Sequence, residues 1–165
     1  MATTTKEMLV AWLKDAHAME EALIPNLENH AKDAKNYPQI QVRIQQHIDE
    51  TRRHAELVAG CIERLGDKPS KAKDVLGKVQ GAMAGTGTAP FGDELVKDLL
   101  ADFSTEHLEI ASYEALITAA RDVGDETTAT TCEQILRDEE AMAKAIEENL
   151  PIVVRDALHA GAAGR

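Results

Sequence analysis

Aromatic side chains are scarce in this chain, because only 3% of its 165 residues are Phe, Trp or Tyr. So few rings leave little surface on which the bases of a single nucleic-acid strand could stack. Basic side chains are also in the minority, since 18 Lys and Arg face 29 Asp and Glu and the net charge is −11. An acidic chain gains little from contact with phosphates, so we expect no nucleic-acid partner.

Long apolar runs are lacking as well. No stretch approaches the roughly 20 residues that cross a bilayer, and no basic and then apolar leader opens the sequence. We therefore expect no membrane partner and a cytoplasmic location. Cysteine is limited to Cys61 and Cys132. Both lie on apolar helical stripes, which favours buried reduced thiols over a disulfide or a catalytic nucleophile.

What the chain does have is helical periodicity. Apolar residues recur at helical spacing over about 4–35, where Thr4 and Glu7 form a capping-box pattern and Pro25 predicts a kink. A tight turn follows, and a second helix is expected over about 38–66. The first half of the chain therefore predicts an antiparallel helical hairpin.

The second half predicts another hairpin after an interruption. Residues 67–92 are rich in Lys, Gly and Thr, which is typical of a long crossover and leaves room for a short extra helix. A third helix then ends at Gly124, Asp125 caps a fourth, and Pro151 is expected to end it before a disordered tail over 151–165.

These segments predict one all-α domain spanning 1–165, with a four-helix bundle over about 4–150. Its two antiparallel helical hairpins would be joined by the long crossover. That connectivity is the ferritin-like arrangement of a four-helix bundle.

In each helix, acidic residues interrupt the apolar stripe that should face the core of the bundle. A single such glutamate usually lies at the edge of a stripe and reaches solvent. These acids, however, share a level in the bundle, because Glu20 lies 16 residues before Asn36 and Glu50 lies 14 after it. Around Gly124 the two acids lie 15 residues before and after. The acids of this group are Glu20, Glu50, Glu106, Glu109 and Glu139.

Such a group of carboxylates would repel strongly in a core unless protons or cations neutralised it, and the stripes offer no matching set of lysines. Bound metal ions would resolve the conflict. Carboxylates with a few imidazoles suit iron or manganese better than zinc.

Histidine is the second kind of candidate ligand. His47, Glu50 and His54 share one face of the second helix, and His54 lies near the level of Glu20. We take His54 as a candidate ligand and His47 as a weaker one, although a hydrogen-bonded core histidine is an alternative for both. Tyr113 is a candidate hydrogen-bond partner of the site, or an ordinary core residue.

The segments 106–113 (EHLEIASY) and 47–51 (HIDET), together with Pro25 and the acidic run 138–140, resemble the YciE/YciF-like stress proteins of the ferritin-like superfamily. The resemblance covers nearly the whole chain, roughly residues 6–151. It implies a bacterial, cytoplasmic, homodimeric stress protein similar to the di-iron domain of rubrerythrin.

The rubrerythrin-like ligand pattern is matched only in part. After Glu50 the expected histidine position holds Arg53, and the imidazole arrives one residue later. After Glu139 no histidine occurs at the expected position, and a shift of one residue would let Asp138 substitute for Glu139. The metal ligands implied are Glu20, Glu50, His54, Glu106, Glu109 and Glu139.

The resulting hypothesis is a ferritin-like carboxylate protein that holds two iron ions, with manganese as the alternative, and reacts with peroxide or oxygen during stress. It would be a peroxidase or ferroxidase type of oxidoreductase. The chain has no rubredoxin-like cysteine set, so its electron donor, as yet unknown, would be another molecule. The competing hypothesis is a bundle without catalysis, with or without metal, that acts as a stress-related interaction protein.

Overall fold

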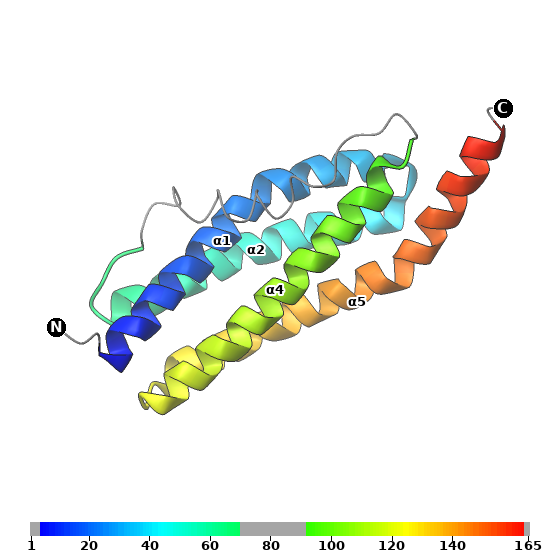
Figure 1. Cartoon of the computed structure of the whole chain (residues 1–165). Coiled ribbons are helices and arrows are strands. Elements are labelled where there is room, and N and C mark those ends of the chain that lie inside the picture. The colour runs from blue at the N-terminus through cyan, green and yellow to red at the C-terminus, as the bar shows by residue number, and fades with distance from the viewer. Residues whose placement is uncertain (1–3, 70–91, 164–165) are drawn as a thin grey trace.

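The computed structural model describes residues 4–69 and 92–163 (Figure 1). Helix α1 spans Thr5–Asp33 and runs through the short 3-10 helix η1, Ala34–Asn36, toward α2, which spans Pro38–Arg64. Helix α4 spans Glu94–Asp122, and α5 spans Glu126–Ala163. The expected all-α, ferritin-like four-helix bundle is confirmed. The expected crossover, with its room for a short extra helix, falls mostly on residues 70–91, which lie outside the described residues.

The helices form two antiparallel hairpins that lie side by side (Figure 1). Helix α1 packs chiefly on α2 and α4 on α5, while α1 also contacts α4 and α2 also contacts α5. In the part of the chain described here, no helix is both long enough and apolar enough to cross a membrane.

The helix ends follow the local signals of the sequence. Thr4 and Glu7 form the reciprocal capping box at the start of α1. Gly124 has φ +77°, a conformation that costs glycine little, and this allows the tight turn between α4 and α5. Asp125 then accepts hydrogen bonds from the backbone N–H and the hydroxyl of Thr128, which caps the start of α5.

The expectation that Pro151 ends the last helix and precedes a disordered tail is wrong. Helix α5 continues through Pro151 to Ala163. Val153 lies beyond the proline, is 2% exposed and belongs to an apolar core cluster. Burial of this side chain favours continued packing of the helix and offsets the hydrogen bond that the proline cannot donate.

The core is divided along the bundle into two apolar clusters. One contains Leu23, Ile44 and Leu99, and the other contains Leu13, Ile62 and Ile135. The gap between the two clusters differs from helix to helix, from Ala16 to Met19 on α1 up to Leu99 to Tyr113 on α4. Most of the buried polar side chains lie at the level between the clusters, which is the middle layer of the bundle. The apolar clusters therefore enclose a charged layer from both ends.

Candidate metal centre

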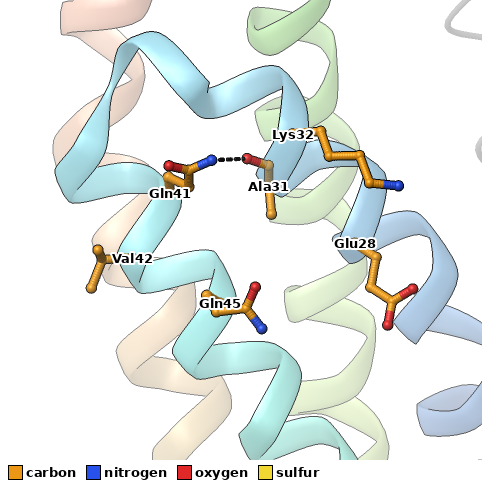
Figure 2. A pocket seen from close by; sticks show the side chains of 6 residues that line it. All are labelled: Glu28, Ala31, Lys32, Gln41, Val42 and Gln45. Carbon is orange, nitrogen blue, oxygen red and sulfur yellow. Dashed lines mark hydrogen bonds between the residues drawn. The ribbon is translucent and has the colours of Figure 1, made fainter.

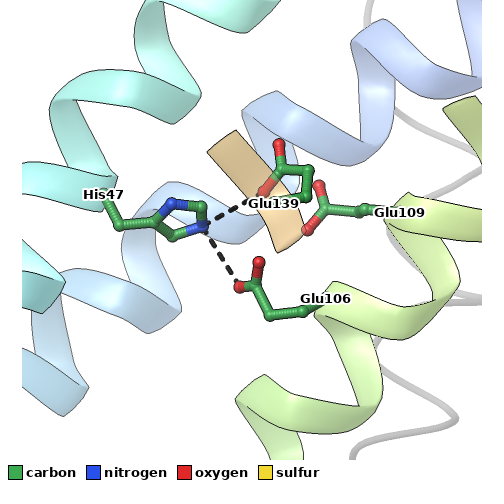
Figure 3. A group of neighbouring side chains, drawn as sticks. All are labelled: His47, Glu106, Glu109 and Glu139. Atoms are coloured by element: carbon green, nitrogen blue, oxygen red, sulfur yellow. Dashed lines mark ion pairs between the residues drawn. The ribbon is translucent and has the colours of Figure 1, made fainter. Parts of the chain in front are cut away.

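Four side chains from three helices meet in the middle layer (Figure 3). His47 of α2, Glu106 and Glu109 of α4, and Glu139 of α5 each place one ligand atom within 4.8 Å of the others. Nε2 of His47 lies 3.1 Å from Oε1 of Glu106 and 3.5 Å from Oε2 of Glu139.

A second group shares one residue with the first. Glu20 of α1, His54 of α2 and Glu139 also have ligand atoms within 4.8 Å of one another. Nδ1 of His54 lies 2.8 Å from Oε1 of Glu139 and 3.6 Å from Oε1 of Glu20. Glu139 therefore places one oxygen toward each imidazole, which is the geometry of a carboxylate that could bridge two metal positions.

The charges of this cluster do not balance internally. It contains four carboxylates and two imidazoles, all at most 2% exposed. Neither oxygen of Glu109, nor Oε2 of Glu20 or Glu106, has a hydrogen-bond partner among the described residues. Even with both imidazoles protonated, four ionised carboxylates would leave a buried negative charge, which is costly. The donor set fits hard or borderline cations with oxygen and imidazole ligands.

Without metal, protons take the place of the cations. Burial raises the pKa of Glu106 to about 8, although His47 opposes this shift. Burial, reinforced by Glu139 and Glu20, raises the pKa of Glu109 well above its ordinary value. Burial lowers the pKa of His54, but its contacts with Glu139 and Glu20 outweigh burial and raise it to about 10. Metal ions would therefore displace protons on binding.

Each imidazole has an outer carboxylate on its second nitrogen. Nδ1 of His47 lies 3.2 Å from Glu50, which in turn accepts a hydrogen bond from Arg43 at 2.9 Å. Nε2 of His54 lies 3.1 Å from Asp138, which accepts from Arg53 at 2.7 Å. An outer carboxylate of this kind orients a metal-binding imidazole and raises its basicity.

Five of the six residues predicted as metal ligands are brought together, namely Glu20, His54, Glu106, Glu109 and Glu139. Glu50 lies outside the two groups of candidate ligands, with 28% of its side chain exposed. The contacts with His47 and Arg43 outweigh partial burial and lower the pKa of Glu50 to about 2. Asp138 also lies outside these groups and does not take the place of Glu139.

The buried face of α2 explains the position of Glu50. At about 100° per residue, Glu50 lies about 60° from His47, on the side away from the buried Ile44. His54 lies only about 20° from His47, so both imidazoles reach the core. The signal for His47 was present in the sequence as its spacing of seven residues from His54.

Tyr113 connects the cluster to one apolar half of the core. Its hydroxyl donates a hydrogen bond to Glu20, and the ring is fully buried. Burial and the adjacent Glu20 raise the pKa of Tyr113 well above its ordinary value. The phenol therefore remains a donor that fixes one oxygen of Glu20.

A hollow of about 520 Å³ between α1 and α2 has different chemistry (Figure 2). Its lining includes Glu28, Lys32 and Gln45, and the amide of Gln41 donates to the carbonyl of Ala31 at 2.8 Å. One acid and one base on a mixed polar surface do not form a group of converging ligands, so the buried cluster is the better candidate site.

The fold and this cluster define a ferritin-like bundle with a buried His/Glu site that could bind metal. Residues 4–159 match the model of the family described as "Domain of unknown function (DUF892)", and the chain belongs to this family. The YciF-like, ferritin-like fold expected from the sequence is confirmed.

Solved structures with this fold come from several bacteria. A protein from Xanthomonas campestris is 36% identical, with a TM-score of 0.82, over 94% of this chain and 97% of that one. The Escherichia coli stress protein YciF is 22% identical, with a TM-score of 0.81, over 93% of this chain and 99% of that one. A Desulfovibrio desulfuricans bacterioferritin, described with a diiron site, is 22% identical, with a TM-score of 0.75, over 96% of this chain and 86% of that one.

Proposed function

We propose that the buried cluster binds two iron ions, with manganese as the alternative, and that the loaded protein reacts with peroxide or oxygen in a bacterial stress response. The observation that carries the proposal is the pair of ligand groups that share Glu139. The ligands would be Glu20, His47 and His54, with Glu106, Glu109 and Glu139. Glu50 and Asp138 would hold the imidazoles in position.

Several features support a redox-active centre over a storage role. Carboxylate ligands favour the ferric state of iron, so a bound pair of irons would supply electrons to an oxidant. The apolar clusters on both sides limit the access of water to this layer. We further propose that the protein works in the cytoplasm as a homodimer and takes electrons from a separate donor.

The test is anaerobic addition of ferrous iron to the metal-free protein, followed by peroxide or oxygen. The proposal predicts saturable oxidation at two irons per chain, with loss of this phase in Glu106→Gln. Glu114→Gln is the matched control, because Glu114 lies exposed on the same helix. Iron oxidation at the rate of free iron, without saturation, would contradict the proposal.

One observation favours the alternative of a bundle without catalysis. Each imidazole already has a cluster carboxylate as its partner, Glu106 for His47 and Glu139 for His54. These pairs, with protons on the remaining acids, neutralise part of the cluster without metal. Saturable binding of iron without subsequent oxidation would support a structural metal, and absence of binding would support a metal-free interaction protein.

A further inference from the structure

A second group of titratable side chains lies beside the cluster, toward the end of the bundle where α1 ends. His30 is in the last turn of α1, and Asp98 and Asp102 are on α4. Nδ1 of His30 lies 2.8 Å from Oδ1 of Asp102, and its Nε2 lies 3.5 Å from Oδ1 of Asp98. The imidazole therefore lies between the two carboxylates.

This group has oxygen atoms that its own contacts do not satisfy. Asp102 is 3% exposed, and its Oδ2 has no hydrogen-bond partner among the described residues. The same is true of Oδ2 of Asp98, whose side chain is 18% exposed. If His30 and Asp102 paired only to stabilise the end of α1, the site would not need two further buried oxygens that lack hydrogen-bond partners.

The acids continue as a row along α4 to the buried cluster. Asp98, Asp102, Glu106 and Glu109 follow one another at spacings of four, four and three residues, so they share one face of the helix. Each step is about one turn, or roughly 5 to 6 Å. Asp102 is close enough to Glu109 to contribute to the raised pKa of that carboxyl, after the larger effects of burial and its nearer acids.

In the other direction the row reaches a surface hollow. Asp33 lies close enough to Asp98 to contribute to the raised pKa of that carboxyl, after the larger effect of burial. Asp33 also lines a hollow of about 420 Å³ between the end of α1, the start of α4 and the last turns of α5. Among the described residues that line this hollow, the acids are Asp33, Asp93, Glu94 and Asp156 and the one cation is Lys35, while Lys97 pairs with Asp93 at 2.9 Å. A concave acidic surface concentrates cations.

We propose that His30, Asp98 and Asp102 form a transit site for a divalent cation, through which metal passes from the acidic hollow to the buried cluster. This proposal rests on the proposed function, because the cluster is the destination. Mixed imidazole and carboxylate donors suit the same metals as the cluster. Fewer donors make the binding weaker, so the cation is passed on to the more complete ligand set.

The test follows the filling of the cluster by Co²⁺ in stopped-flow absorption at wavelengths of its d–d bands. Asp98→Asn and Asp102→Asn are each expected to slow filling at least tenfold, while the final amount of bound cobalt stays that of the wild type. Glu114→Gln carries the same change of charge on the exposed face of α4 and should fill at the wild-type rate. Wild-type rates in both aspartate variants would overturn the transit site.

A second measurement separates this proposal from that of the cluster. In Glu106→Gln/Glu139→Gln, whose cluster is disabled, substoichiometric Mn²⁺ should broaden the imidazole NMR signal of His30, assigned by comparison with His30→Gln. Adding Asp98→Asn and Asp102→Asn should abolish the broadening. A His30 signal in this variant that Mn²⁺ leaves unaffected would overturn the transit site. If His30 does broaden but the wild-type protein takes up no cobalt, the proposal of the cluster alone would be overturned.

Discussion

Nδ1 of His54 lies 2.8 Å from Oε1 of Glu139, and neither side chain is exposed to solvent. The other oxygen of Glu139 faces His47, so one carboxylate serves both candidate metal positions. Substitution of Glu139 should consequently affect both positions at once, whereas each of the other candidate ligands belongs to one position.

Glu139→Gln is expected to weaken both metal positions by about 100-fold or more, because outer partners of metal ligands alone account for about 10- to 100-fold. The substitution removes the negative charge that both groups share, and it replaces one of the two oxygens by an amide nitrogen, so one group also loses an oxygen donor. Competition titration with a chelating dye would measure both affinities. Glu109→Gln is the comparison, since Glu109 occurs in one group only. If Glu109→Gln lowered the affinity of both metal positions as much as Glu139→Gln does, a bridging role of Glu139 would be contradicted.

Glu50→Gln separates a metal ligand from a positioning residue. Because Glu50 contacts the outer nitrogen of His47, we expect the loss of metal affinity to be about 10- to 100-fold with two ions still bound. Glu106→Gln should instead reduce the number of bound ions. If Glu50→Gln also binds one ion fewer, as measured by elemental analysis of dialysed protein, Glu50 is itself a ligand.

The metal-free protein should lose stability as pH rises from about 5 to 9. Burial raises the pKa of Glu106 from 4.5 to about 8, so the folded state keeps a proton that the unfolded chain releases. The stability from this proton is complete below pH 4.5 and is lost as pH rises through about 8. Contacts with Glu139 and Glu20 overcome burial and raise the pKa of His54 from 6.5 to about 10, which adds a loss of the same sign between these values.

Melting temperatures in the presence of a chelator would check this trend. Glu50 does not reverse it, because its pKa is lowered to about 2 and its contribution is lost only in more acidic solution. Glu106→Gln removes one of the titrating groups and should flatten the curve. A melting temperature that rises between pH 6 and 9 would contradict the assignment.

Asp125→Ala should destabilise the protein by about 1 to 2 kcal/mol through loss of the cap of α5. Asp125 accepts hydrogen bonds from Thr128 and from Arg64, which links the second hairpin to α2. Asp125→Asn keeps a capping oxygen and loses the charge, so urea denaturation should place it between the wild type and the alanine variant. Equal stability of wild type and Asp125→Ala would contradict the capping role.

The level of each acid along the bundle could be predicted from the sequence, because the rise per residue in a helix is fixed. The turns at Asn36 and Gly124 are recognisable, and residues can be counted from them in both directions. Glu20 and Glu139 therefore met as expected. The direction of a side chain around the helix was less certain on α2. His47 and Glu50 differ by about 60° around the axis, and which of them faces inward depends on how α2 packs against its neighbours.

The course of the last helix was not predictable from local signals. A proline within a helix usually indicates its end, and burial of Val153 became apparent only once α2, α4 and α5 were placed together. The group around His30 was missed for a similar reason, since His30 and Asp102 are 72 residues apart in the chain. Nothing in the sequence pattern around either residue pairs the end of α1 with α4.

The continuation of α5 past Pro151 has a practical meaning for work on this protein. Its last turns border the acidic hollow, at the opposite end of the bundle from the start of α1 (Figure 1). A polyhistidine tag fused after α5 would bring extra imidazoles to the rim where cations are proposed to gather, and would compete for the metal being measured. Purification handles therefore belong at the beginning of the chain.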